Sequence, residues 1–468
     1  MSSEHDLDDL DRHETERMNM HHRNSDFARR IASRSMTRRD FMWLATVGAA
    51  GATAGCAANP VTGRQQLMIL SEANEIALDK EHSPHQFSAD YGAVQDVRLN
   101  QYITTVGESM TGFTHRPHMP YSYRCVNATY VNAYTFPGGS MATTRGIMLE
   151  MQDEAELAGL LGHEMGHVNA RHTAARMSTG ILTSVVLLGA SAALASQGET
   201  WGAVAAGLGG VAAGALLAHY SRNDERQADN LGMEYMTKSG YSSEGMVGLM
   251  DVLRNMQKNN PSAIEMMFST HPMSEERYQT AVREAASTYG HARTQPLYRE
   301  RYMDHTAGLR RIKGAIEKMQ EGEKLMRQEQ FSPAETALDD ALRQAPEDYA
   351  GLMLMAKCQL AMDRPRRAEF FADKARTIYP AEAQAHHVSG VAKLKLDQFE
   401  AAYDQFDRYE KLLPGNPNTV FLKGISQEAM GRRNQAAQEY QRFLGTVRQG
   451  EQAEYAYGRL VEWGVIAP

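Results

Sequence analysis

The polar and apolar positions of residues 151–162 follow the period of an amphipathic helix. Acidic side chains stand in its first turns, at Asp153, Glu154 and Glu156, and leucines follow at helical spacing. The pattern continues into residues 163–167, which we therefore expect on a half-buried face of the same helix.

A period of 34 residues predicts a different architecture for the C-terminal third of the chain. Prolines and two sets of small residues share this period: Pro346, Pro380 and Pro414; Ala334, Ala368, Ala402 and Ala436; Ala356, Gly390 and Gly424. Small residues where paired helices touch, with proline at the end of the second helix, are typical of tetratricopeptide (TPR) repeats. Stacked repeats bind peptide segments on a concave surface, and five tyrosines either line that surface or pack between helices: Tyr349, Tyr379, Tyr403, Tyr409 and Tyr440.

Residues 131–146 suit two strands joined by a tight turn at Pro137–Gly139. The first strand contains Asn132, Ala133 and Tyr134. These residues either form an edge that holds an extended peptide by main-chain pairing, or belong to an ordinary hairpin that packs on the helices.

An uncharged region rich in alanine, glycine, leucine and valine runs from 177 to 196 and again from 201 to 218. Each half is near the minimum length of a membrane span, and glycine and serine lower its hydrophobicity. We therefore predict a helical hairpin that covers a cleft or leans on a membrane. A pair of membrane-spanning helices is the alternative.

The predicted helix ends in the motif H-E-x-x-H, at His163, Glu164 and His167. Two histidines four residues apart lie about 40° apart around a helix, so both imidazoles can reach one metal ion. Glu164 can then face a water molecule whose pKa zinc lowers to roughly 7. Zinc hydrolases use three protein ligands, so a third ligand must come from elsewhere.

Glu225 is the candidate for that third ligand. It shares a helical face with Asp229, four residues later, which would orient a ligand histidine. Asp224 is a rival, but it points about 100° away from Glu225 around the helix. A solvated charged helix is the alternative for this segment.

Four motifs in one order resemble those of the HtpX-like gluzincin metallopeptidases, relatives of the CAAX prenyl proteases: Asn132–Gly139, His163–His167, Ser221–Gly232 and Ser269–Pro272. The resemblance covers residues 59–285. It implies one zinc ion per chain, with His163, His167 and Glu225 as its ligands, and Glu164 as the catalytic base.

The same resemblance places His271 near the active site. There it would either stabilise the oxyanion of the tetrahedral intermediate or approach the zinc and block the water position. A histidine in a surface loop is the alternative, since Pro272 biases His271 toward an extended backbone.

Residues 36–56 have the features of an export signal. Arg38 and Arg39 form a twin-arginine motif, a short apolar run follows, and Thr53–Cys56 reads as a lipobox that would lipidate Cys56. Threonine departs from the usual leucine at the first lipobox position. Ala57 is not the aspartate that typically retains lipoproteins in the inner membrane, so the outer membrane of a Gram-negative bacterium is the predicted destination.

Composition argues against a disulfide-stabilised protein and against a protein that binds nucleic acid. Only three cysteines occur and lipidation would use one, so we expect no disulfide framework. A net charge of −8 argues against nucleic acid as a partner.

Together these patterns predict an α+β chain, with a mostly helical zincin-type metallopeptidase domain that has a small β-sheet, followed by an all-α TPR solenoid. The expected segments are an N-terminal extension with its signal, the metallopeptidase domain, a linker helix, the TPR repeats and a C-terminal cap: residues 1–56, 57–285, 286–316, 317–453 and 454–468.

The predicted function is zinc-dependent endoproteolysis of misfolded or misassembled envelope proteins that the TPR repeats recruit. The predicted location is the periplasm, with a lipid anchor in the outer membrane, and outer-membrane assembly machinery is a candidate partner. The alternative is a chaperone or assembly scaffold for outer-membrane proteins whose proteolysis is latent.

Overall fold

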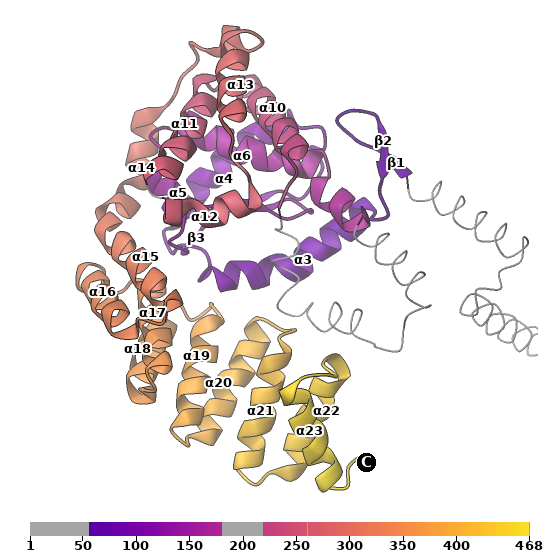
Figure 1. The fold of residues 1–468 in the computed structure, drawn as a ribbon, viewed down its shortest axis with the longest axis vertical. Helices are drawn as coiled ribbons and strands as arrows, with labels where there is room; N and C mark the ends of the chain where they lie inside the picture. Colours follow the sequence, from indigo (N-terminus) through magenta and orange to yellow (C-terminus); the bar gives the residue numbers. More distant parts are fainter. Residues whose placement is uncertain (1–55, 180–218, 260, 468) are drawn as a thin grey trace, which may run out of the picture. The chain divides into compact units, whose positions relative to one another are not determined.

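The computed structural model describes residues 56–179, 219–259 and 261–467. These residues form two compact units, of which the smaller comprises residues 56–59, 63–71 and 174–179 and the larger comprises the rest. In the smaller unit, β1 (Cys56–Ala58) pairs antiparallel with β2 (Gln65–Leu67). The larger unit contains both the H-E-x-x-H helix and the repeats (Figure 1).

Three short strands form the sheet of the larger unit: β3 (Ser122–Val126), β4 (Ala133–Thr135) and β5 (Ser140–Thr144). Their order is β3-β5-β4, with β3 parallel and β4 antiparallel to the central β5. The predicted hairpin is therefore present as β4 and β5, and β4 lies at an edge of this sheet.

Helices surround the sheet, and their bounds in chain order are α3 (Glu72–Ala89), α4 (Val97–Thr111), α5 (Arg145–Glu150), α6 (Glu154–Asn169), α10 (Arg222–Lys238), α11 (Glu244–Asn259), α12 (Pro261–Thr270), α13 (Glu275–Ala286), the 3-10 turn η2 (Gly290–Ala292) and α14 (Arg299–Arg311). The segment predicted as a linker thus contains η2 and α14. Tyr302 of α14 is fully buried in the core of the catalytic part, so this helix packs as part of that core.

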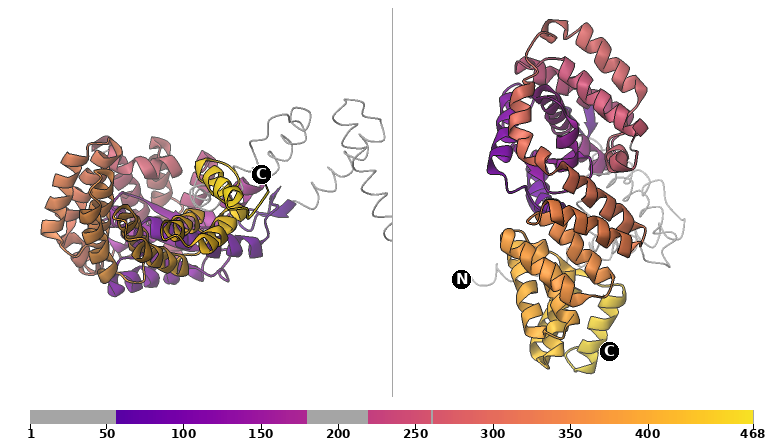
Figure 2. Two further views of the ribbon diagram at one scale, coloured as in Figure 1. Left: turned by 90° about the horizontal axis from the view of Figure 1, so that it is seen from below. Right: turned by 90° about the vertical axis from the view of Figure 1, so that its left-hand side faces the viewer.

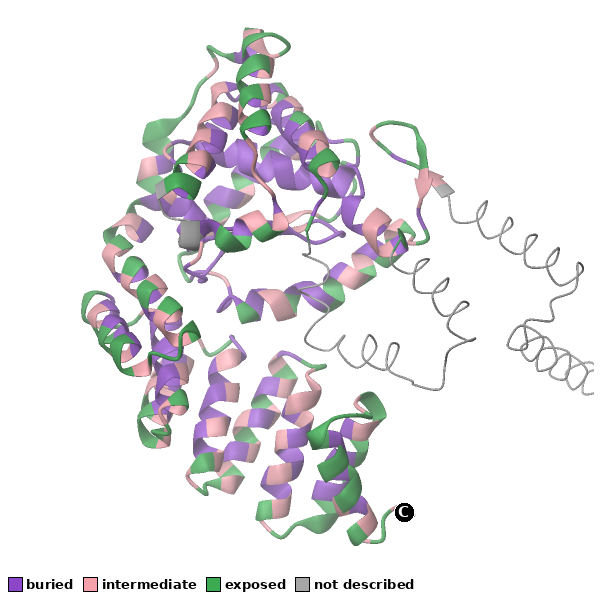
Figure 3. Ribbon diagram, in the orientation of Figure 1, coloured by how far each residue is buried: buried purple, intermediate pink, exposed green. Residues whose placement is uncertain are grey.

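Helix α6 is buried along its whole length (Figure 3). Asp153 caps its N-terminus by accepting the Glu156 N–H at 2.9 Å, as the acidic start of the pattern indicated. Ser221 and Asp224 form a capping box at the start of α10. Both helices that carry the predicted metal ligands therefore begin at a fixed residue.

Glycines let α6 and α10 approach very closely. A Cβ added to Gly162 would lie 2.9 Å from the carbonyl oxygen of Gly232, and one added to Gly166 would lie 2.8 Å from Cα of Ala228. Any larger side chain at these positions would push the helices apart. This contact sets the distance between the two halves of the predicted metal site.

The C-terminal helices form antiparallel pairs, seen from two further directions in Figure 2. Their bounds are α15 (Lys313–Arg327), α16 (Phe331–Gln344), α17 (Tyr349–Ala361), α18 (Pro365–Ile378), α19 (Gln384–Lys395), α20 (Phe399–Leu412), α21 (Pro417–Ala429), α22 (Arg433–Thr446) and α23 (Glu451–Glu462). The small residues of the 34-residue period lie where these helices touch. A Cβ on Gly390 would meet the ring of Phe406 at 2.6 Å, and one on Gly424 would meet Tyr440 at 2.5 Å.

The tyrosines of the repeats serve mainly as packing residues. Tyr349, Tyr409 and Tyr440 are buried, whereas Tyr379 and Tyr403 are half-buried. The predicted fold class, a mostly helical domain with a small sheet followed by a helical solenoid, is confirmed.

Several predictions concern residues outside the described part of the chain. The signal before Cys56 and residues 180–218 of the predicted hairpin lie there. Among the helices that the structure does describe, none is long and apolar enough to cross a membrane. Cys125 and Cys358 are both buried free thiols.

Candidate metal centre

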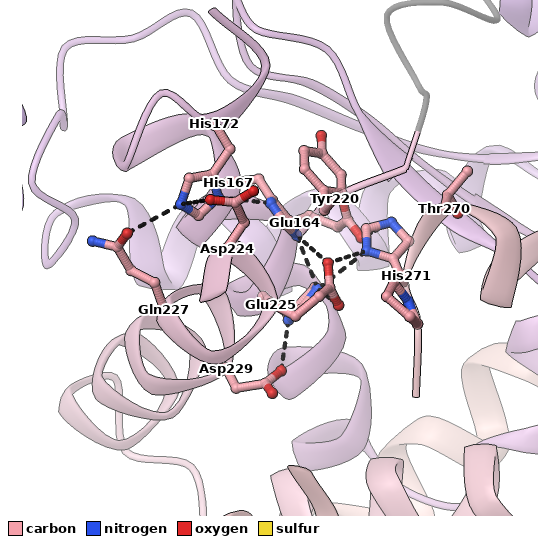
Figure 4. A network of polar contacts seen from close by, with 12 residues as sticks. Glu164, His167, His172, Tyr220, Asp224, Glu225, Gln227, Asp229, Thr270 and His271 are labelled. Atoms are coloured by element: carbon pink, nitrogen blue, oxygen red, sulfur yellow. Dashed lines mark hydrogen bonds and ion pairs between the residues drawn. The ribbon is translucent and has the colours of Figure 1, made fainter. Parts of the chain in front are cut away.

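Four buried side chains from three parts of the chain converge at one point, and three of them, His167, Glu225 and His271, are labelled in Figure 4. His163 and His167 come from α6, Glu225 comes from α10, and His271 follows the last residue of α12. Each offers a ligand atom, and these atoms all lie within 4.8 Å of one another. The structure thus brings together the three predicted ligands and the histidine that the sequence left between two roles.

The donor set suits zinc. Nε2 of His163 lies 3.1 Å from Nε2 of His167, and the Glu225 carboxylate lies 3.6 Å from the first and 3.4 Å from the second. Two imidazoles and one carboxylate are a ligand set that zinc takes in hydrolases. Burial holds the pKa of His167 well below its usual range, which favours the neutral imidazole that a metal requires.

His163 is oriented by the residues on its far side. Its Nδ1 lies 2.9 Å from Asp229 Oδ1, so the Nε2 atom faces His167 and Glu225. Asp229 is held in turn by Arg277, whose Nε and Nη2 each donate to it at 2.7 Å. Asp229 therefore lies where the predicted role requires it.

Arg277 also pairs with Glu225, at 2.7 Å between Nη1 and Oε2. One buried guanidinium therefore fixes both Glu225 and Asp229. Burial raises the pKa of Glu225, but His271, His167 and the other neighbouring groups hold it well below its usual range overall. The carboxylate is accordingly ionised, as a metal ligand must be.

His167 is positioned by further residues that the sequence patterns did not predict. Nδ1 of His172 lies 2.9 Å from Nδ1 of His167, and Nε2 of His172 lies 3.1 Å from Gln227 Oε1. The ring of Tyr220 stacks on His167 with 3.7 Å between centroids. The structure thus puts His172 behind His167, in contact with it.

Glu164 differs from the other acidic groups of the site. Its side chain is 1% exposed, and neither carboxylate oxygen accepts a hydrogen bond from any described residue. The nearest ion-pair partner is His271, whose Nε2 lies 3.7 Å from Oε1. Burial raises the pKa of Glu164, an effect that His271 and His163 oppose.

His271 is buried among the ligands, with Nδ1 3.2 Å from Glu225 Oε1 and 3.4 Å from His163 Nε2. Burial alone would lower the pKa of His271, but the carboxylates of Glu225 and Glu164 raise it overall. The structure does not place it in a surface loop open to water.

The predicted substrate edge packs on α6. Ala133 and Tyr134 are buried in β4, and the Tyr134 hydroxyl donates to Asp90 at 2.5 Å. Asn132, just before the strand, has a buried side-chain oxygen without a hydrogen-bond partner among the described residues. The strand pairs with β5 on one side only.

Similarity to known proteins agrees with this geometry. Residues 98–285 match the profile of peptidase family M48. The chain is 31% identical over 194 residues to metalloprotease YcaL of Escherichia coli (strain K12), covering 41% of this chain and 69% of that one. It is 28% identical over 234 residues to the beta-barrel assembly-enhancing protease of Yersinia pestis, covering 47% of this chain and 46% of that one, so it spans about half the length of this relative. A solved structure, the TPR protein YrrB, matches with 15% identity and a TM-score of 0.30, over 44% of this chain and 96% of that one.

The fold and the site define the class of protein, a metallopeptidase followed by helical repeats. The chain belongs to peptidase family M48. This membership confirms the resemblance and the class that the four sequence motifs predicted.

Proposed function

We propose that this chain is a zinc-dependent endopeptidase of the bacterial envelope. The observation that carries the proposal is the meeting of His163, His167 and Glu225 beside Glu164, a buried carboxylate that accepts no hydrogen bond from the described residues. A group left unpaired at such cost is one that a reaction uses. Similarity to a metalloprotease and to an assembly-enhancing protease supports the same function.

A zinc ion held by His163, His167 and Glu225 would supply Lewis-acid polarisation of the scissile carbonyl and acidify a water molecule. Glu164 takes the proton of that water and returns it to the leaving amine. Its raised pKa suits both transfers, because such a carboxyl exchanges protons nearer neutral pH. His271, whose pKa the two neighbouring carboxylates raise, would donate a hydrogen bond to the oxyanion.

The experiment that tests this proposal is the substitution Glu164→Gln. We expect cleavage of fluorescein-labelled casein to fall by roughly 10²- to 10⁴-fold, with zinc content unchanged, because the base is lost and the ligands are not. Glu108→Gln, at an exposed position of α4, is the control. Unchanged cleavage by a zinc-loaded Glu164→Gln protein would show that the proposal is wrong.

We propose further that the substrates are misfolded or misassembled envelope proteins, that the repeats recruit them or outer-membrane assembly machinery, and that a lipid on Cys56 anchors the chain to the outer membrane. Beta-strand pairing with β4 would require little of the substrate sequence, which suits unfolded substrates. Cys56→Ala should move the protein from the membrane fraction to the soluble periplasmic fraction.

A second candidate function is a chaperone or assembly scaffold with latent proteolysis. The position of His271 favours it, because Nδ1 lies within 3.4 Å of both Glu225 and His163 and competes for the space in front of the ligands. In a strain that lacks this protein, rescue of envelope stress by Glu164→Gln would support the scaffold and count against the peptidase.

A further inference from the structure

Helices α15 and α17 of the repeats hold both ends of the β4–β5 hairpin. At the start of the hairpin, the Thr129 hydroxyl donates to Glu323 at 2.6 Å, and Gln320 Nε2 donates to the Thr129 carbonyl at 2.6 Å. At its end, Arg145 Nη1 pairs with Asp348 Oδ2 at 2.5 Å, and Nη2 lies 3.4 Å from Oδ1. Asp348 is also the N-cap of α17.

The Arg145–Asp348 pair is deeply buried. The Arg145 side chain is 2% exposed and that of Asp348 is 6% exposed. Most other ion pairs of the repeats join residues that are close in sequence or in neighbouring helices, whereas this pair joins the repeats to the residue after β5. Loss of either partner would leave a buried charge without compensation, so the pair strongly fixes the distance between its two elements.

Hydrogen bonds from both the backbone and the hydroxyl of Thr144, the residue before Arg145, connect it with Asn132. The Thr144 N–H donates to the Asn132 carbonyl, and the Asn132 N–H donates to Thr144 Oγ1, each at 3.0 Å. Arg145 itself donates its N–H to the Ala128 carbonyl at 3.1 Å. A shift of Arg145 would therefore shift Asn132 and the start of β4.

A separate series of contacts links α17 to the middle of β4 through Tyr91 and the neighbouring Asp90. The Tyr134 hydroxyl and the Tyr130 hydroxyl both donate to Asp90, at 2.5 and 2.8 Å. The next residue, Tyr91, has a left-handed backbone (φ 64°), and Lys357 of α17 lies 4.5 Å from its ring centroid and 3.4 Å from its hydroxyl. The same repeat helix thus reaches the hairpin by a second route.

We propose that Arg145 is a positioning residue of the peptidase, and that the repeats, through Asp348, set the place of the strand that receives substrate. This inference rests on the proposed function, since it assigns β4 as the substrate edge. The repeats are then part of the substrate site as well as a recruitment module. A protein segment that binds to α15 or α17 and displaces these contacts would change the affinity of the active site.

The test compares Arg145→Met with the pair Arg145→Met/Asp348→Asn. We expect Arg145→Met to raise KM for a casein peptide about 10-fold with kcat within about twofold, because the edge is misplaced while the metal site is intact. Amide hydrogen exchange in residues 130–135 should become faster. The double variant removes both charges and keeps an N-cap residue on α17, so both effects should be smaller.

Lys393→Met is the matched control, because Lys393 is buried and pairs with Glu369 and Asp373 inside the repeats. It should lower stability without changing KM or exchange in residues 130–135. If Arg145→Met does not fold, Gln320→Ala replaces it; this half-buried residue loses one bond to Thr129, and KM should rise about 2- to 3-fold.

The exchange measurement, made in the Glu164→Gln background, separates this inference from the proposed function because it needs no activity. Faster exchange caused by Arg145→Met, together with no cleavage by the wild-type protein, would support the positioning role and contradict the peptidase. Unchanged exchange and unchanged KM in folded Arg145→Met, or equal effects in the Lys393→Met control, would overturn the inference.

Discussion

The candidate metal centre and the contact between the third and fourth pairs of repeat helices both bury charge, but the surrounding residues compensate it in only one of them. In the repeats, Lys423 is 5% exposed and meets three carboxylates, of Asp407 at 2.9 Å, Glu410 at 2.8 Å and Glu439 at 3.4 Å. In the metal centre, Glu164 is 1% exposed and accepts no hydrogen bond from the described residues. Both side chains are buried, but only Lys423 has partners within hydrogen-bonding distance, whereas the nearest ion-pair partner of Glu164 is 3.7 Å away.

This difference distinguishes charges that hold the architecture from charges that are kept for chemistry. A buried group whose partners are all present contributes to a unique packing, whereas an unpaired one costs stability and is retained because a ligand or reaction uses it. The comparison makes opposite predictions for substitutions in the two regions.

The largest expected effect is at Glu225, the proposed metal ligand from α10. Glu225→Gln should remove most bound zinc, because a neutral amide is a poor ligand. The loss of zinc affinity should exceed the roughly 10- to 100-fold loss expected when a residue that only orients a ligand is replaced. Zinc content after gel filtration is the measurement. Asp224→Asn is the control, since Asp224 caps α10 without joining the cluster, and equal zinc in both variants would break the comparison.

Lys423→Met should lower the free energy of unfolding by about 3 kcal/mol, because three carboxylates are left around a buried neutral group. Zinc content should not change. Lys411→Met is the control: Lys411 pairs with the same Asp407 but its side chain is 68% exposed, so urea unfolding should hardly shift. A similar loss in both variants would mean that burial is not the cause.

Arg277→Gln tests the boundary between the two kinds of charge, since Arg277 fully pairs two acidic residues of the site. We expect zinc affinity to fall by about 10- to 100-fold, measured by competition with a chelating dye. Arg226→Gln is the control, because Arg226 also joins α10 to α13, but through an exposed pair with Glu276. Unchanged zinc affinity in Arg277→Gln would show that Arg277 stabilises the fold and has no role in positioning the ligands.

The smallest effect concerns Glu156, seven residues before His163. Burial raises the pKa of this carboxyl to about 7 from its ordinary 4.5. The folded protein therefore binds the proton more tightly than the unfolded chain, and stability falls as pH rises between these values. In Glu156→Gln, the loss of stability between pH 5 and pH 7 should be smaller than in the wild type by about 1–2 kcal/mol. Urea unfolding at both pH values is the measurement. Glu300→Gln, at an exposed position, is the control and should show the same pH dependence as the wild type.

Much of the site could be predicted from the sequence, because local spacing determines it. His163 and His167, like Glu225 and Asp229, share a helical face by virtue of being four residues apart. The 34-residue period likewise predicted the repeats, since the same small residue must recur wherever two helices touch.

Contacts made by tertiary packing could not be predicted. Arg277 lies on a third helix and has no spacing relation to α10, and nothing in the sequence relates Asp348 to Arg145, 203 residues away. The contact of His172 with His167 could not be predicted from spacing either, because the chain leaves the α6 helix after Asn169 and turns at Arg171, which has a left-handed backbone. Spacing rules do not extend past such a turn.

The close approach of α6 and α10 has a consequence for how the proposed site would acquire a metal ion. Because glycines bring the two backbones into contact, the histidines and Glu225 stand on what is effectively one rigid support. The ligands then need little rearrangement to receive an ion, so the entropy of assembling the site is already lost during folding. We expect zinc uptake at a rate limited by entry and ion dehydration, with almost no change in backbone exchange of either helix.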